Sequence, residues 1–454
     1  MILVMTGKQY LGYAKVLHML DTHGSGRVNV KSPISILPVW MIPTGYAAVT
    51  IIAGLTLPRL EHVYLGSYSH SLSVSSAQAL FSAIASGMMA FTGIVFSLQF
   101  VRVTFGSMAY SPRVVAFLVR DTTLYHSLGI FTATFGFALA TLAWTDRGGL
   151  GKVPLFSAIL VFVLLILSML AFGRLIQGVS DIQITRILQI IGKSGRRVVQ
   201  EMFPLLDAPE AELVVALSKA AEIVHNRQAS QTILYTNEPK VVGAFDIDAL
   251  VVLAKRYDVM IKLECAVGDT LTFESTAMFV YGNGKIIPEA DLRKTIKLVS
   301  ERTFEQDPKY PIRLLVDIAI RALSPAVNDP TTAVQAIDQI EDILRRLGKR
   351  KLGTGYAADE NNNLRVLFPT PTWDDYLALA FDEIRQYGSS SVQVMRRMRS
   401  ALYDLAETLT VAVRQKSVLN YIEHINLNIE RCMLDKQDLL MAMQEDKQGL
   451  GLSR

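Results

Sequence analysis

The sequence has few of the residues that build catalytic and metal sites. Its 454 residues include two cysteines, Cys265 and Cys432, and seven scattered histidines, none of which has a second ligand at metal-binding spacing. It also has no glycine-rich phosphate loop. We therefore expect no metal and no cofactor, and we find no motif that indicates an enzyme.

Charge is absent from long parts of the first 175 residues. Residues 153–172 form an apolar run without one charged side chain, and core helices of soluble proteins seldom stay apolar on every face for so long. A bilayer core requires roughly 20 apolar residues per helix. The sequence predicts an α-helical membrane domain at residues 34–175, with four transmembrane helices at about 34–57, 79–101, 123–144 and 153–173.

Lysine and arginine are unequally divided between the flanks of these spans. They cluster before the first span, between the second and third, and after the fourth, whereas the other two loops carry only Arg59, Arg147 and Lys152. The positive-inside rule then places both termini in the cytoplasm, with residues 1–33 as a cytoplasmic segment. No span has an acidic residue at its centre, which argues against proton pumping.

Residues 176–454 are expected to form a cytoplasmic α+β domain. Half of the whole chain is hydrophobic but 19% is charged, so a water-exposed part must accompany the membrane part. The net charge of +4 is modest and is explained by the basic membrane flanks. We therefore expect no nucleic-acid partner.

Periodicity divides this domain into a β-rich part and a helical part. Short apolar runs and an Asn283-Gly284 turn signal predict a small β-rich module at about residues 230–288. Residues 289–454 are mainly helical in pattern, and Asp329-Pro330 is typical of a helix start. The pattern predicts helices at 312–323, 330–348, 373–387 and about 391–443, with one short strand at 364–369.

Small residues form a stripe in the second span. Ser82, Ser86, Gly87, Ala90 and Gly93 recur at spacings of three and four, and Gln99 lies near the inner end. Small residues allow membrane helices to approach closely. The stripe therefore predicts either a helix-packing surface or, in a ring of subunits, the wall of a pore.

A second candidate site lies between two helices of the domain. Asp317 and Arg321 are four residues apart on a largely apolar helix, so they would neutralise each other if buried. Together with Asn328 and Asp329 they could line a polar pocket with an acid or base. The alternative is a structural corner in which Asp329 caps the next helix.

Several of these residues carry a resemblance to a known family. The sequence resembles the predicted membrane proteins catalogued as domain of unknown function 2254, from about residue 34 to residue 415. The resemblance implies a bacterial inner-membrane protein with the same two parts, and it implies no established activity. The matching positions are Phe96, Ser97, Ser111, Pro112, Arg113, Asp121, Gly129, Asp317, Arg321, Ser324, Pro325, Asn328, Asp329 and Pro330.

Two functional hypotheses follow. In the first, the protein is a homo-oligomeric channel or transport-related protein whose second span lines the pathway and whose cytoplasmic domain forms a vestibule or gate. In the second, the helices anchor a cytoplasmic sensor, scaffold or enzyme with its site around Asp317, Arg321, Asn328 and Asp329. Analogy with channels that join few spans to a β-rich cytoplasmic layer favours the first. The sequence does not identify an ion or small-molecule ligand.

Overall fold

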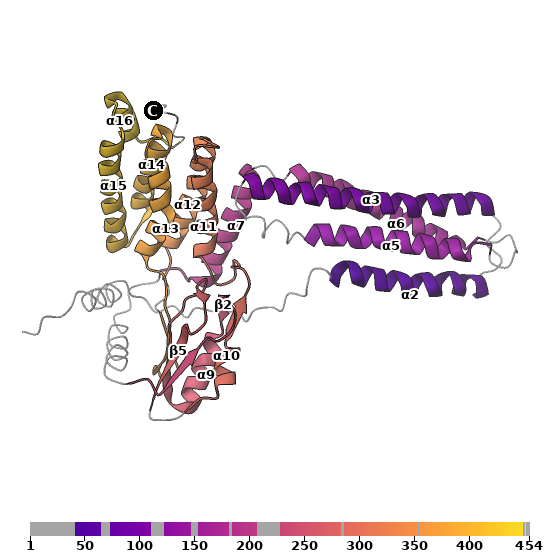
Figure 1. The fold of residues 1–454 in the computed structure, drawn as a ribbon, viewed down its shortest axis with the longest axis horizontal. Coiled ribbons are helices and arrows are strands. Elements are labelled where there is room, and N and C mark those ends of the chain that lie inside the picture. The colour runs from indigo at the N-terminus through magenta and orange to yellow at the C-terminus, as the bar shows by residue number, and fades with distance from the viewer. Residues whose placement is uncertain are drawn as a thin grey trace, which may run out of the picture. The chain divides into compact units, whose positions relative to one another are not determined.

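The chain contains two compact units. A computed structural model describes residues 41–64, 73–109, 122–146, 153–180, 184–206, 228–282, 286–352, 355–447 and 450 (Figure 1). One unit lies within residues 34–187, called here the N-terminal unit, and the other within residues 188–454, called the C-terminal unit.

The N-terminal unit consists of four long apolar helices. Each is long and apolar enough to cross a membrane, which confirms the prediction of four such helices. They are α2 (Met41–Tyr64), α3 (Val74–Ala109), α5 (Thr122–Trp144) and α6 (Leu155–Ser180). Helix α2 continues past Pro58, and α3 is longer than predicted at both ends. Hydropathy marks only the apolar part of a helix, whereas backbone hydrogen bonds continue into polar residues.

Helix α5 lies against the other three helices and is joined to α2 through small residues. A Cβ added to Gly54 would lie 2.6 Å from the Cβ of Ala140, and one added to Gly129 would lie 2.5 Å from the ring of Tyr46. Close backbone approach of this kind is how membrane helices pack. Glycine is therefore required at these contacts between α2 and α5.

A buried carboxylate joins α2 to the first turn of α6. Glu61 is 8% exposed, and its two oxygens accept the backbone N–H groups of Phe156 at 2.7 Å and Ser157 at 3.0 Å. The first N–H groups of a helix have no partner within the helix, so Glu61 satisfies two of them.

The C-terminal unit contains two small sheets, as the predicted α+β class requires. The five-stranded sheet has the order β1-β5-β3-β8-β7, in which only β3 and β8 are parallel, and the three-stranded sheet is antiparallel with the order β4-β2-β6. The strands are β1 (Gln231–Leu234), β2 (Lys240–Phe245), β3 (Val259–Leu263), β4 (Thr270–Leu271), β5 (Thr276–Gly282), β6 (Ile296–Val299), β7 (Tyr356–Ala358) and β8 (Leu364–Leu367).

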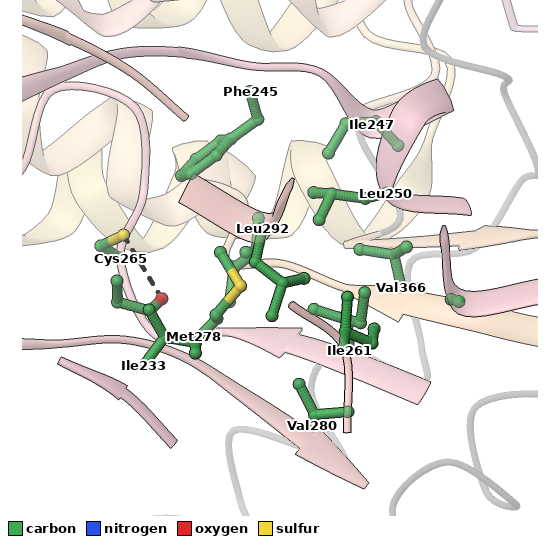
Figure 2. Close-up of a cluster of buried hydrophobic side chains, with 14 of the residues drawn as sticks. Ile233, Phe245, Ile247, Leu250, Ile261, Cys265, Met278, Val280, Leu292 and Val366 are labelled. Atoms are coloured by element: carbon green, nitrogen blue, oxygen red, sulfur yellow. Dashed lines mark hydrogen bonds between the residues drawn. The ribbon is translucent and has the colours of Figure 1, made fainter. Parts of the chain in front are cut away.

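One apolar core joins these strands to α9 (Ile247–Tyr257) and α10 (Glu289–Lys294). Leu250 of α9, Ile261 of β3 and Val366 of β8 are completely buried in it, beside Met278 of β5 (Figure 2). Strands β6 and β7 were not predicted. Both are short and half exposed, so they lack the apolar alternation that identifies a strand from sequence.

The remaining elements are helices, of which α11 to α16 pack on one another (Figure 1). They are α7 (Ile184–Met202), α11 (Lys309–Ala322), α12 (Pro330–Gly348), α13 (Trp373–Tyr387), α14 (Val392–Thr408), α15 (Ala412–Cys432) and α16 (Lys436–Met443). The helices predicted at 330–348 and 373–387 are confirmed. The single helix predicted at about 391–443 is wrong, because extended backbone at Leu409 and Met433 divides it into three.

Helix α7 is held to α12 by glycines and a charged side chain. A Cβ added to Gly195 would lie 2.6 Å from Cδ1 of Ile343, so only glycine allows this approach. Beside it, Arg196 donates to Asp342 at 3.0 Å and to Gln339 at 3.1 Å. The C-terminal half of α7 is thus an integral part of the C-terminal unit.

Candidate functional site

The exposed face of α3 is the first candidate site. Helix α3 buries a different face, which includes Phe81, Ile84 and Met88, in the interior of the N-terminal unit. The predicted stripe lies opposite: Ser82, Ser86, Ala90 and Gly93 are exposed, and Gly87 is half-buried at the edge. A Cβ added to Gly87 or Gly93 would have no atom within 4 Å. The stripe therefore does not pack against any helix that the structure describes in this chain.

The structure extends the stripe along the helix. Ser97 Oγ donates to the carbonyl of Gly93 at 3.1 Å, and Thr104 Oγ1 donates to the carbonyl of Phe100 at 2.9 Å. Phe100 is the one large residue within the stripe and is 72% exposed. The exposed small residues, called here the α3 stripe, are Ser75, Ala79, Ser82, Ser86, Ala90, Gly93, Ser97 and Thr104.

Gln99 does not belong to this stripe, contrary to the sequence-based expectation. It lies six residues after Gly93, and this spacing places it about two-thirds of a turn away from Gly93 around the helix axis. Its Oε1 atom is buried and accepts no hydrogen bond within the described structure. Gln99 therefore belongs to the buried side of α3.

The outer faces of α2 and α6 differ in kind from the α3 stripe. They present large aliphatic and aromatic side chains, as expected for surfaces that contact lipid. The exposed residues of this type on the two helices are Met41, Val49, Ile51, Ile52, Leu55, Leu60, Val63, Tyr64, Phe156, Ile159, Phe162, Val163, Ile166, Leu167, Met169, Leu170 and Ile176. The exposed side of α3 also carries large apolar residues, so the α3 stripe is a narrow band of small residues between them. These large residues are Met89, Ile94, Phe96, Phe100 and Val101.

In the second candidate site, Asp317 has a charged partner that the sequence analysis did not name. Asp317 is 9% exposed and accepts from Arg313, one turn earlier, at 2.7 Å and 2.6 Å. Arg313 also pairs with Glu383 of α13, and this contact is the main cause of a raised Arg313 pKa. Sequence reasoning paired Asp317 with Arg321 and missed Arg313, although i−4 is the same spacing as i+4.

In the corner between α11 and α12, the polar side chains form hydrogen bonds with groups of the corner itself. Asp329 accepts the backbone N–H of Thr332 at 3.1 Å and its hydroxyl at 2.5 Å. Asn328 adopts a positive φ of 48°, which asparagine tolerates better than most residues. Ser324 Oγ donates to the carbonyl of Arg321 at 2.7 Å. These contacts make a helix corner with a capping residue and do not point to acid–base chemistry.

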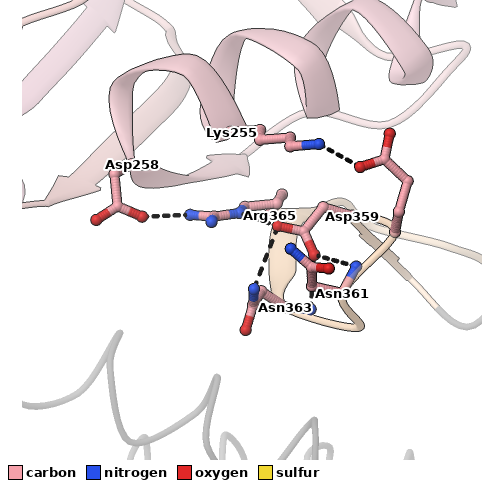
Figure 3. Close-up of polar contacts among 7 residues, drawn as sticks. Lys255, Asp258, Asp359, Asn361, Asn363 and Arg365 are labelled. Carbon is pink, nitrogen blue, oxygen red and sulfur yellow. Dashed lines mark hydrogen bonds and ion pairs between the residues drawn. The ribbon is translucent and has the colours of Figure 1, made fainter.

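A denser polar cluster lies in the turn between β7 and β8 (Figure 3). Asp359 accepts the N–H groups of Asn361 at 3.0 Å and Asn363 at 2.9 Å, and Arg365 donates to it at 2.8 Å. Arg365 also bridges to Asp258 at 2.9 Å. The cluster closes the hairpin and anchors it to the end of α9, so its role is structural.

Comparison with known proteins identifies the family. Residues 38–404 match the model of the family described as "Predicted membrane protein (DUF2254)". The chain belongs to this family. It is also 26% identical over 421 residues to uncharacterised proteins of Mycobacterium bovis and Mycobacterium tuberculosis, covering 89% of this chain and 78% of each relative. No solved structure matches.

Membership of DUF2254 confirms the resemblance noted from sequence. Of the family-motif positions, Phe96 is exposed on α3, Ser97 lies in the α3 stripe, and Gly129 lies under Tyr46. The motif from Asp317 to Pro330 forms the corner between α11 and α12. Ser111, Pro112, Arg113 and Asp121 fall outside the described residues.

Proposed function

We propose that this DUF2254 protein is a homo-oligomeric channel of the bacterial inner membrane, in which the α3 helices of several copies surround the pathway. The observation that carries the proposal is the α3 stripe, which is exposed along the helix while the chain's own helix contacts lie elsewhere. A Cβ added to Gly93 of this stripe would have no atom within 4 Å.

We propose that this surface faces a pathway and not lipid. The outer faces of α2 and α6 carry large apolar side chains, whereas the side chains of the α3 stripe are small and partly hydroxylated. The stripe follows spacings of three and four residues along the described helix, so its members share one face of that helix. A ring of copies would turn the same face of each subunit towards its centre.

Hydroxyl groups favour a pathway at the centre of such a ring. Ser75, Ser82, Ser86 and Ser97 are exposed on this face, and serine can hydrogen-bond both to its own helix and to water. The stripe carries no charge, so we expect passive conduction with weak charge selectivity. With both termini in the cytoplasm, the C-terminal unit would form the vestibule or gate on that side.

Enlarging the stripe tests the proposal. Gly93→Leu should leave the oligomer and its melting temperature unchanged, because the site is open, and should lower the conductance of proteoliposomes in potassium chloride. Gly54→Leu is the matched control. Its added bulk would meet Ala140, so it should destabilise the protein by about 1–3 kcal/mol through overpacking.

Three outcomes would overturn the channel. They are an intact Gly93→Leu oligomer with unchanged conductance, a wild-type protein that conducts nothing under voltage or membrane tension, and a Gly93→Leu protein that dissociates into single subunits. Dissociation would show that the stripe is a packed interface without a pathway.

The second candidate function is a membrane-anchored cytoplasmic sensor. The observation that favours it is a cavity in the C-terminal unit, lined by Phe203, Phe245 and Asp307 among others. The corner at Asp317, Arg321, Asn328 and Asp329 supports this reading less, because its contacts are those of a structural corner. A purified protein that is monomeric would favour the anchored sensor over the channel.

A further inference from the structure

The exposed side of α7 carries three basic residues in one line. Arg186, Lys193 and Arg197 are exposed, and their spacings of seven and four residues place them on one face of the helix. Leu188 and Ile191 on the opposite face are 1% and 0% exposed. The packing of α7 therefore leaves the line of basic residues open, and we call it the basic face of α7.

Two of these three cations have no acidic partner among the described residues. Arg196, beside the basic face, pairs with Asp342 at 3.0 Å. Lys193 and Arg197, in contrast, form no ion pair with any residue that the structure describes. Glu201 is the acidic residue of α7 and is exposed one turn after Arg197. A single carboxylate at its edge leaves the basic face with an excess of positive charge.

The start of α7 is tied to an apolar helix by the length of the chain. Helix α6 is long and apolar enough to cross a membrane. It ends at Ser180, and α7 begins at Ile184. Because an extended chain covers at most about 3.6 Å per residue, the first residue of α7 lies within about 14 Å of the last residue of α6. Helix α7 thus begins near the surface of the bilayer that α6 would span.

The composition of this side of α7 suits lipid headgroups better than acyl chains. Among its described residues, 184–202, α7 exposes no large apolar side chain. Lysine and arginine are attracted to an anionic membrane surface, and arginine can also form two parallel hydrogen bonds with a phosphate. The positive-inside rule explains why basic residues follow a span, but it does not require them to line one exposed face of a folded helix.

We infer that the basic face of α7 binds the phosphate groups of anionic phospholipids, so that α7 lies along the membrane surface. A soluble acidic protein or a nucleic acid fits less well, because α7 begins so close to a membrane span. The contact is electrostatic, so it should weaken at high salt. It goes beyond the proposed channel and stands whether or not the protein conducts.

A fluorescent label at Gln200 tests the inference in the full-length protein. Gln200 is exposed and shares the basic face, seven residues after Lys193. It lies about 24 Å along the helix from Ile184, so closeness to α6 alone does not bring it to the membrane surface. Gln200→Cys would be labelled with bimane in a Cys432→Ser background, since Cys432 is exposed and Cys265 is buried.

The labelled protein is placed in nanodiscs that contain a lipid with a nitroxide quencher on its headgroup. Phosphatidylglycerol added to phosphatidylcholine should increase the ratio of quenched to unquenched label, and high salt should reverse the increase. Lys193→Gln and Arg197→Gln should each lower that ratio about fivefold, because each removes one charge from the surface contact. Lys193→Arg combined with Arg197→Lys keeps both charges and should preserve the ratio. Lys416→Gln combined with Lys436→Gln removes two exposed lysines of α15 and α16 and should also preserve it.

The inference is overturned if phosphatidylglycerol does not change the ratio, or if Lys193→Gln combined with Arg197→Gln is quenched like the wild type. It is also overturned if the label responds only to a soluble polyanion such as heparin, which would make the basic face a docking site for an acidic macromolecule. Both substitutions change exposed side chains, so the melting temperature should match that of the wild type. Conductance plays no part in the measurement, so a failure here would count against the lipid contact alone.

Discussion

At the residue scale, the carboxylate of Asp359 is stabilised by several donors at once. Burial opposes its ionisation, but the hydrogen bonds from Arg365, Asn363 and Asn361 outweigh this and lower its pKa from 3.8 to about 2. Hydrogen bonds to the charged form of a carboxyl group have this effect. The contribution of the turn between β7 and β8 to stability should therefore depend on pH.

We expect Asp359→Asn to lower the melting temperature most at neutral pH. Above about pH 4 the carboxylate is ionised in both folded and unfolded chains, so its hydrogen bonds contribute fully to stability. As the pH falls from about 4 towards 2, the unfolded chain binds a proton first and this contribution is lost. Melting curves of both proteins between pH 7 and pH 2.5 test this. A difference that stays constant over that range would contradict it.

At the element scale, α11 is joined to α13 by one arginine that serves two acids. Arg313 pairs with Asp317 on its own helix and with Glu383 on α13. Removing Arg313 takes one cationic partner from both carboxylates, whereas removing Asp317 leaves Arg313 paired with Glu383. The two substitutions should therefore lower the free energy of unfolding by different amounts.

Arg313→Ala should destabilise the protein by about 3 kcal/mol, since it takes a charged partner from the buried Asp317. Asp317→Ala should cost less. Thermal unfolding of the two variants measures the order, and Lys294→Ala, which breaks an exposed pair, should cost less than about 1 kcal/mol. Equal losses for Arg313→Ala and Asp317→Ala would show that Glu383 contributes nothing to the network.

Elements with local signals could be predicted from the sequence, and those that depend on distant partners could not. Asp329 and Pro330 mark the start of α12 because capping involves only neighbouring residues. Arg396, Arg397 and Arg399 in α14 are all buried, although such a run usually indicates a solvent-exposed face. Their partners come from three other helices: Met441 of α16, Asp338 and Glu341 of α12, and Asn426 of α15.

In the candidate sites, too, local features could be predicted and those that depend on distant partners could not. The periodicity of small residues on α3 was visible in the sequence. Whether that face is exposed or buried was not, because exposure depends on where α5 and α6 lie. The cavity in the C-terminal unit had no sequence signal at all. Its lining comes from residues between 202 and 371, and no short motif connects them.

At the scale of the whole molecule, the two cysteines provide a topology test. Cys432 is exposed, whereas Cys265 is 3% exposed. Burial, followed by the negative charge of Asp269, raises the pKa of Cys265 to about 12. A thiol with such a pKa is not reactive near neutral pH. The folded chain should therefore react with a maleimide at Cys432 alone.

If the C-terminal unit is cytoplasmic, a membrane-impermeant maleimide should label Cys432 only after the membrane has been opened. Spheroplasts labelled before and after permeabilisation, followed by mass spectrometry of the Cys432 peptide, give the measurement. Cys432→Ser is the control for specificity. Labelling of Cys432 in intact spheroplasts would overturn the proposed orientation of the whole chain.

The parallel pairing of β3 with β8 has a consequence for how the protein is made. Ile261 pairs with Val366, and more than 100 residues, including α11 and α12, are synthesised between them. Until β8 leaves the ribosome, one edge of β3 has no partner, and an open strand edge promotes association with other chains. In the proposed membrane arrangement, the apolar helices that precede the sheet are inserted before β8 is made. A nascent chain that stalls between β6 and β8 would then be tethered at the membrane with an incomplete sheet, and this is the stage at which a chaperone would be needed most.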